Sequence, residues 1–146
     1  MPRRFTHTEA QSLIPQVGGL LRDALAAKSE YDQAERTIQE FAERVMMMGG
    51  ITVDRERAIG SRDRRNTAAE LLRGAIEQVQ ETGCVLKDLD IGLVDFPTLL
   101  RGVEVYLCWK LGEPAIEFWH GVDEGFRGRK AIDQDFLDHH TGDRAQ

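Results

Sequence analysis

The sequence predicts an α+β protein in which a long antiparallel helical hairpin, packed like a coiled coil, is followed by a small antiparallel β-sheet of three or four strands. Apolar residues recur at steps of three and four through the first half of the chain, and the step changes to two after Gly83. Glycine and proline separate the later segments. We therefore expect a single domain, residues 1–146, made of a helical hairpin (5–83), a β-meander with a glycine-rich loop (84–132) and a tail (133–146).

The first helix is expected to begin at Thr6. The Thr6 hydroxyl can cap free amides of the first turn, Glu9 can reach back to the Thr6 amide, and Phe5 can pack against the helix. Pro15 lies well inside the helical pattern, where it removes a backbone donor and crowds the preceding turn. We therefore expect a kink or break between residues 14 and 19.

The second helix is expected to return antiparallel to the first. Gly49 and Gly50 end the first helix, and a loop of about ten residues connects the two. The second helix then runs from Ser61 or Asn66 to Gly83. The first apolar stripe, residues 20–48, is longer than this second helix, so part of it is predicted to need another surface to pack on.

The second half of the chain predicts strands. β-Branched and aromatic residues alternate with polar ones in four segments. We expect strands at Cys84–Lys87, Ile91–Phe96, Val103–Lys110 and Ala115–His120.

The register of the last hairpin decides which side chains can act together. With a four-residue loop at Leu111–Pro114, Cys108 lies opposite Glu117 and the apolar and polar residues separate cleanly onto two faces. A register one residue away mixes charged and apolar groups on both faces, which costs burial. The preferred register points Cys108 and His120 to opposite faces and therefore argues against a cysteine–histidine pair.

Composition limits the class of protein. The 146 residues are 41% hydrophobic, and 25 acidic against 19 basic side chains give a net charge of −6, which repels nucleic acid and anionic lipid. The two cysteines are too few for a disulfide framework. The N-terminus has no signal-peptide pattern, and no window approaches about 18 uninterrupted apolar residues. We expect a soluble cytoplasmic protein that binds neither nucleic acid nor membrane.

Several segments carry a family resemblance. They are Gly92–Pro97, Glu104–Pro114, Trp119-His120, Gly125-Phe126-x-Gly128-Arg129 and the opening Phe-Thr-x-x-Glu-Ala followed by Leu-Ile-Pro. Together they resemble the bacterial family catalogued as domain of unknown function 2203. This resemblance covers nearly the whole chain and implies no reaction, substrate or cofactor.

The candidate site residues lie on or after the predicted sheet. They are Asp95, Glu104, His120, Arg127 and Arg129. Asp95 follows a buried run, so its carboxylate must be paired or bonded to amides, either in an Asx turn or in contact with a metal or ligand beside His120. Glu104 lies on the polar face, where carboxylates either bind a divalent cation or join a charge network. The two arginines lie in a glycine-rich loop that fits either anion binding or a structural role.

Two hypotheses about function follow. The first is a non-enzymatic interaction module that forms a homodimer or other homo-oligomer through the helical hairpin, because part of the first apolar stripe is left uncovered. The second is a small-molecule, anion or divalent-metal site on the sheet, with or without catalysis. The sequence does not identify a cofactor, a metal or a substrate.

Overall fold

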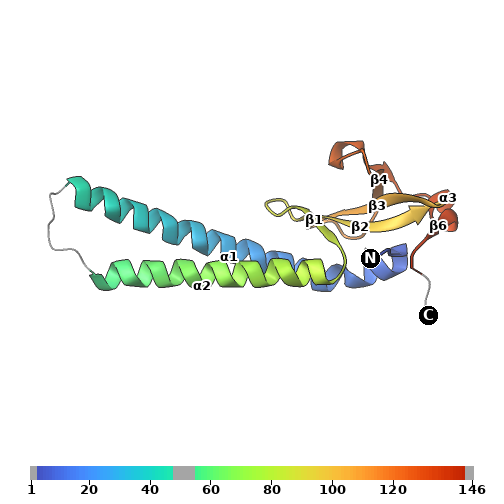
Figure 1. Ribbon diagram of the computed structural model, residues 1–146. Helices are drawn as coiled ribbons and strands as arrows, with labels where there is room; N and C mark the ends of the chain where they lie inside the picture. Colours follow the sequence, from blue (N-terminus) through green and yellow to red (C-terminus); the bar gives the residue numbers. More distant parts are fainter. Residues whose placement is uncertain (1–2, 48–54, 144–146) are drawn as a thin grey trace. The chain divides into compact units, whose positions relative to one another are not determined.

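The structure, a computed structural model, describes residues 3–47 and 55–143. Its helices are α1 (His7–Met47), α2 (Arg55–Glu81) and the short α3 (Gln134–His139), with a 3₁₀ turn at Phe126–Gly128. Its strands are β1 (Val85–Asp88), β2 (Leu93–Leu100), β3 (Val103–Lys110), β4 (Phe118–Gly121), β5 (Lys130–Ala131) and β6 (His140–Thr141). Two long helices followed by an antiparallel sheet confirm the predicted α+β class (Figure 1).

The chain forms two compact units, and one of them is built from two segments that are far apart in the sequence. The first, here called the sheet unit, combines the chain up to Leu21 with the chain from Ile76 onward. The second, here called the arm, is Arg22–Ala75 and contains the remaining parts of α1 and α2. The arm is therefore inserted in sequence between the two segments that build the sheet unit.

The sheet has more strands than the three or four that we expected. Its order is β1-β2-β3-β4-β5, with β6 paired to β2 beyond the end of the β1 pairing. All pairs are antiparallel, and β2, β3 and β4 are neighbours in the middle of the sheet. The additional strands β5 and β6 have two residues each, too short to leave an alternating pattern in the sequence.

The start of α1 follows the sequence prediction closely. The Glu9 N–H donates to Thr6 Oγ1 (3.1 Å) and the Thr6 N–H donates to Glu9 Oε1 (3.0 Å), which is the reciprocal capping box. Phe5 is fully buried beside it. The predicted break near Pro15 does not occur, because α1 is helical through that position. Burial of Val17 and Leu21 in the core offsets the backbone hydrogen bond that the proline removes.

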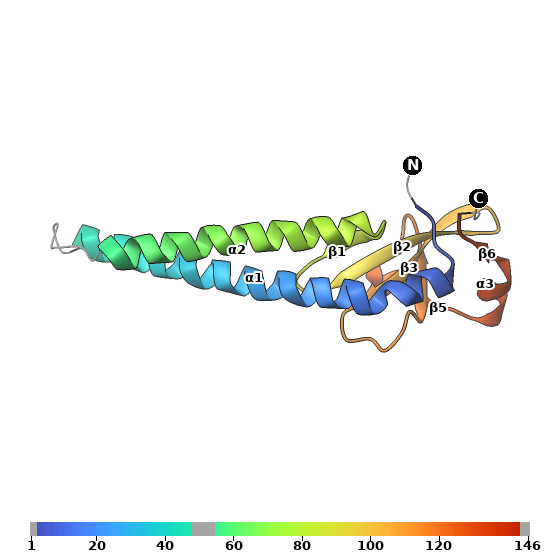
Figure 2. The same cartoon turned by 90° about the horizontal axis from the view of Figure 1, so that it is seen from below.

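The C-terminal segment is bonded to the beginning of α1. The Asp143 N–H donates to the Arg4 carbonyl, and the Arg4 N–H donates to Asp143 Oδ2, both at 3.1 Å. One turn further on, the His7 N–H donates to His140 Nε2 at 2.9 Å. Figure 2 shows α3 and β6 beside the first turns of α1. Both ends of the described chain are thus fixed in the same unit.

The core of the sheet unit lies between one face of the sheet and the first turns of α1. Phe5 packs edge-on against Phe96, with the ring centroids 5.2 Å apart. The buried members of this core are Phe5, Ala10, Val17, Leu21, Val79, Cys84, Val94, Phe96, Val105, Leu107, Trp109, Ile116 and Phe136. The opposite face of β2, β3 and β4 is therefore the face left for the polar side chains discussed below.

The arm is built from small buried residues at seven-residue spacing. Ala27 and Ala34 are buried in α1, and Ser61, Ala68 and Ala75 are buried in α2. Small residues at this spacing allow two helices to approach closely along a shared seam. Charged groups stay outside, where Arg64–Glu30 (3.7 Å) and Arg65–Glu35 (2.8 Å) join the two helices.

The second helix is longer than expected. It begins at Arg55 rather than at Ser61 or Asn66, so residues 55–60 are helical instead of belonging to a loop. The acidic, basic and alanine side chains of this segment support a helix, whereas the sequence prediction gave more weight to the mixed charge. As a result α1 outruns α2 by less than we expected. The Gly49-Gly50 cap lies outside the described residues.

The register of the β3–β4 hairpin corrects the sequence prediction. Cys108 lies opposite Phe118, and Tyr106 lies opposite His120, one residue away from the expected pairing. The reason is Ile116, which leaves the sheet to enter the core beneath α1, where its N–H donates to Gln11 Oε1 (2.8 Å). The connection between the strands thus becomes longer, and every β4 side chain moves to the other face.

Candidate metal centre

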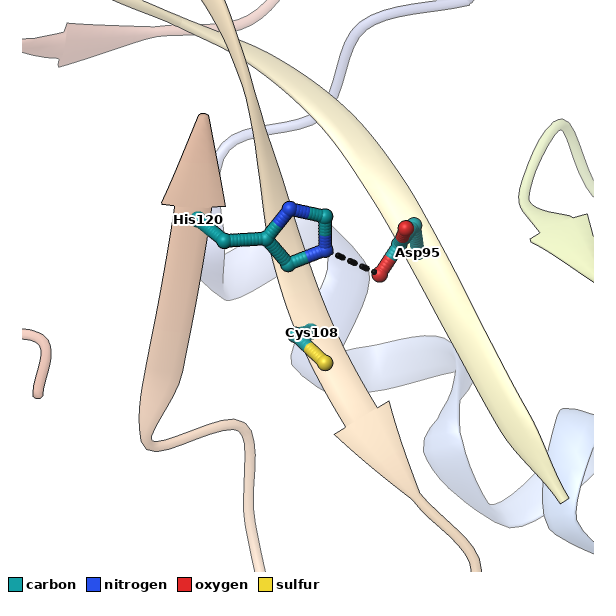
Figure 3. A group of neighbouring side chains, drawn as sticks. All are labelled: Asp95, Cys108 and His120. Atoms are coloured by element: carbon teal, nitrogen blue, oxygen red, sulfur yellow. Dashed lines mark hydrogen bonds and ion pairs between the residues drawn. The ribbon is translucent and has the colours of Figure 1, made fainter. Parts of the chain in front are cut away.

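Three adjacent strands bring Asp95, Cys108 and His120 together. Asp95 on β2 lies directly across from Cys108 on β3, and His120 on β4 lies two residues beyond the partner of Cys108. The corrected register places all three on one face of the sheet, here called the site face. One donor atom from each lies within 4.8 Å of the others (Figure 3). The predicted separation of Cys108 from His120 is therefore wrong.

All three side chains are removed from water. The exposed fractions are 1% for Asp95, 1% for Cys108 and 4% for His120. Burying ionisable groups is costly unless they are paired, bonded to donors or bound to a metal ion. Within the described part of the chain, these are the His, Cys, Asp and Glu side chains that gather in a group of three or more.

The hydrogen bonds of His120 determine where its protons lie. Nδ1 is 2.9 Å from the Gly121 carbonyl, which can only accept, so Nδ1 carries a hydrogen. Nε2 is 3.0 Å from Asp95 Oδ1. Because lone pairs of both atoms meet there, one proton must lie between them, on the imidazole or on the carboxyl group. A proton, or another cation in its place, must therefore lie between His120 Nε2 and Asp95 Oδ1.

Asp95 is only partly satisfied by this contact. Burial raises the pKa of its carboxyl group, against the opposing effects of His120, Lys87 and Cys108. Asp95 Oδ2 is buried and accepts no hydrogen bond of normal geometry from the described residues. A buried carboxylate oxygen without a donor is unusual, because it forfeits the hydrogen bonds it made in water. This oxygen is available as a ligand.

Cys108 is poorly suited to act as a nucleophile. Burial, followed by the charge of Asp95, raises the pKa of its thiol to about 11, so the thiol is protonated at neutral pH. A cysteine nucleophile also needs a histidine nitrogen within reach as base, with the other nitrogen oriented by a third group. Here Nε2 of His120 faces Asp95 and Nδ1 faces Gly121, so neither nitrogen is available to Cys108.

The other residues predicted for a site lie in different surroundings. Glu104 is half-buried at the start of β3, opposite Leu99, and is not part of the three-residue group. Arg127 is exposed in the 3₁₀ turn. Arg129 donates two hydrogen bonds to Glu113, from Nη1 to Oε1 (3.0 Å) and from Nη2 to Oε2 (2.8 Å). Arg129 is the predicted arginine that approaches the group, with Nη1 4.0 Å from Cys108 Sγ.

Tyr106 and Lys87 border the group on the site face. The half-buried Tyr106 ring is 5.5 Å from the His120 ring, measured between centroids. The exposed Lys87 places its ammonium 5.3 Å from the centroid of the Tyr106 ring. The lysine charge also favours ionisation of the buried Asp95. The group is therefore bordered on this side by an aromatic ring and a cationic side chain.

The donor set matches a borderline transition-metal ion. Thiolate sulfur, imidazole nitrogen and carboxylate oxygen are the ligands of Zn²⁺ and its neighbours, whereas Mg²⁺ and Ca²⁺ prefer oxygen alone. Tetrahedral coordination at the usual zinc bond lengths sets the ligand atoms about 3.5 Å apart. His120 Nε2 and Asp95 Oδ1 are 3.0 Å apart, and all three ligand atoms lie within 4.8 Å of one another, so small side-chain rotations would bring them to this spacing. The Nδ1 bond to Gly121 fixes the ring as metal-ligating histidines require.

Comparison with protein-family models assigns the chain to a family. The family model for an uncharacterized conserved protein (DUF2203) matches residues 3–132. The chain belongs to this family. No curated protein and no solved structure matches the chain. None of the helices in the described residues combines the length and apolar character needed to span a bilayer.

Sequence reasoning found Asp95 and His120 but set Cys108 aside and did not consider Glu113 as a partner of Arg129. Cys108 was set aside because the predicted β3–β4 register placed it on the face opposite to His120, and the structure has a different register. One signal in the sequence could have recovered it: Trp119 is the larger apolar residue of β4, and it packs with Phe136 beside the core, 5.2 Å between ring centroids. Assigning Trp119 to the core face moves His120 to the face of Cys108.

Proposed function

We propose that this protein binds one divalent transition-metal ion of the zinc class through Asp95, Cys108 and His120. The observation that carries the proposal is a buried group of three different ligand types in which Asp95 Oδ2 accepts no hydrogen bond of normal geometry from the described residues. Three protein ligands leave a coordination position for water or for an atom of a bound molecule, as in catalytic rather than structural zinc sites. When bound, such an ion acidifies a coordinated water.

Charge balance supports a metal ion over a purely structural cluster. The Asp95 carboxylate and the Cys108 thiolate together carry two negative charges, which a divalent cation neutralises. In its absence the same position must be held by the proton shared between Asp95 and His120 and by the thiol proton. Metal binding at neutral pH is therefore coupled to the release of about two protons.

Cobalt titration of chelator-treated protein tests the proposal. We expect one Co²⁺ per chain, a thiolate-to-cobalt charge-transfer band, and the strong visible bands of a four-coordinate ion. Isothermal titration calorimetry in buffers of different ionisation enthalpy should report about two protons released per Zn²⁺. Zinc at 100 times its Kd should raise the free energy of unfolding by about 2.7 kcal/mol.

The second cysteine supplies a matched control. Cys84 is buried in the core of the same unit, where its Sγ lies 3.4 Å from the Val79 carbonyl. Cys84→Ser should keep the charge-transfer band, whereas Cys108→Ser should lose it and release about one proton instead of two. Wild-type protein without a thiolate band, or a band that survives in Cys108→Ser, would contradict the proposal.

The setting that we propose is a bacterial cytoplasm. Cys84 and Cys108 are free thiols in the structure, which suits a reducing compartment. The net charge of −6 argues against nucleic acid as a partner.

We also propose that the arm mediates self-association, as a homodimer or a larger homo-oligomer. The support for it is that Leu71 (63% exposed) and Ile59 (57% exposed) are large apolar side chains on α2 that packing within the arm leaves in water and that a second copy would cover. Sedimentation velocity should show a concentration-dependent dimer that Leu71→Glu weakens. A monomer at all concentrations would exclude this second function.

A further inference from the structure

Arg129 is held rigidly next to the candidate metal centre by contacts that do not involve the centre itself. Its guanidinium forms two parallel hydrogen bonds with the Glu113 carboxylate, and both side chains are mostly buried, 16% exposed for Arg129 and 20% for Glu113. Paired N–H groups bonded to paired carboxylate oxygens fix the plane of the guanidinium as well as its position. The arginine therefore has little freedom to turn away.

Two aromatic rings fix the same group further. The guanidinium carbon of Arg129 lies 4.0 Å from the centroid of the Phe118 ring and 4.3 Å from that of Phe126. Cation–π contacts of this kind are strongest where the cation has lost part of its water. Phe118 is the cross-strand partner of Cys108, so an arginine over this ring is aligned with the cysteine.

Glu113 is anchored in turn to the end of β3. Its Oε1 accepts from the Lys110 N–H (2.7 Å), and its carbonyl accepts from Trp109 Nε1 (3.0 Å). Although burial opposes ionisation, the hydrogen bonds from Arg129 and from the Lys110 amide lower the pKa of the Glu113 carboxyl group. The loop after β3, the carboxylate and the arginine thus form one ordered arrangement.

The remaining contact of Arg129 points at the sulfur. Nη1 lies 4.0 Å from Cys108 Sγ, at the outer limit for a hydrogen bond to sulfur. A neutral thiol gains little from this neighbour. A thiolate gains a charge-assisted hydrogen bond, because the guanidinium keeps its positive charge at every relevant pH.

We propose that Arg129 is a positioning residue for the metal centre, donating a hydrogen bond to the metal-bound thiolate of Cys108 and holding the sulfur in its ligating orientation. This inference rests on the metal site proposed above. The arginine lowers the cost of forming the thiolate in a buried place, and it withdraws electron density from the sulfur. Removing a partner of this kind typically weakens metal binding by roughly 10–100-fold.

The test compares Arg129→Gln with Lys130→Gln by Co²⁺ titration of the full-length protein. Lys130 is the next residue in the chain and loses the same charge, but its ammonium lies over the Trp119 ring at 4.7 Å and pairs with Glu124. We expect Arg129→Gln to weaken Co²⁺ binding roughly 10–100-fold. The thiolate-to-cobalt band should also move to lower energy, because a sulfur without the hydrogen bond gives up an electron more readily. Lys130→Gln should change neither quantity.

A second variant distinguishes the loss of the Arg129 contact from misfolding of the protein. Arg129→Lys keeps the charge but cannot make the two parallel bonds to Glu113, so we expect a smaller band shift in the same direction with the fold retained by circular dichroism. Unchanged band energy and affinity in both Arg129 variants would overturn this inference while leaving the metal site standing. Absence of the band in the wild type would instead overturn the metal site on which the inference rests.

Discussion

The arm and the site face of the sheet differ in where their charged side chains lie, at the surface in the arm and buried on the site face. In the arm, ion pairs such as Arg65–Glu35 stay at the surface, about a third exposed, and the buried seam is made of alanine and serine. On the site face, Asp95 and His120 meet at 3.0 Å with almost no exposure, beside a buried thiol. Surface pairs contribute little to stability, whereas a broken buried pair is costly. The arm is organised for packing, and the site face retains charge that packing alone does not explain.

The largest expected effect tests the buried side of this comparison. In chelator-treated protein, Asp95→Ala removes the partner of His120 Nε2 and should lower the free energy of unfolding by about 3–5 kcal/mol. Asp95→Asn should cost much less, because its amide can still donate to Nε2. Both tryptophans, Trp109 and Trp119, belong to the sheet unit, so urea unfolding followed by their fluorescence reports on the affected region.

The matched change in the arm is Arg65→Ala, which breaks an ion pair of 2.8 Å, close to the 3.0 Å of His120–Asp95. It should cost at most about 1 kcal/mol, measured by circular dichroism, because the partners are already partly hydrated. If the two alanine variants destabilise the protein equally, the contrast between the regions does not hold.

An effect of intermediate size tests the packing of the arm. Ala34 is fully buried, so Ala34→Leu forces extra volume into the close seam and should cost about 1–3 kcal/mol. Ala26→Leu, at an exposed position of the same helix, should stay within about 0.5 kcal/mol of the wild type. Thermal unfolding followed at a helical wavelength compares the two. Equal stability would mean that the seam has room for larger residues.

The same contrast explains which parts of the structure could be predicted from the sequence. The arm and the start of α1 follow from local rules: the Thr6–Glu9 capping box and the helical repeat act between residues close in sequence. The β3–β4 register depends on Ile116, whose backbone is held by Gln11, more than a hundred residues earlier. No local pattern contains that contact. Asp95 and His120 were found because buried polar residues stand out in an apolar run, whereas the role of Cys108 depended on the register.

The insertion of the arm between the two segments of the sheet unit has a consequence for synthesis on the ribosome. The arm needs only residues 22–75, so its helices can pair as soon as that stretch has emerged. The sheet unit cannot close until Asp143 reaches Arg4, almost the full length of the chain. Contacts of such long sequence separation form slowly, because a large loop must be closed first. The nascent chain should therefore carry a finished arm while the three candidate ligands are still apart.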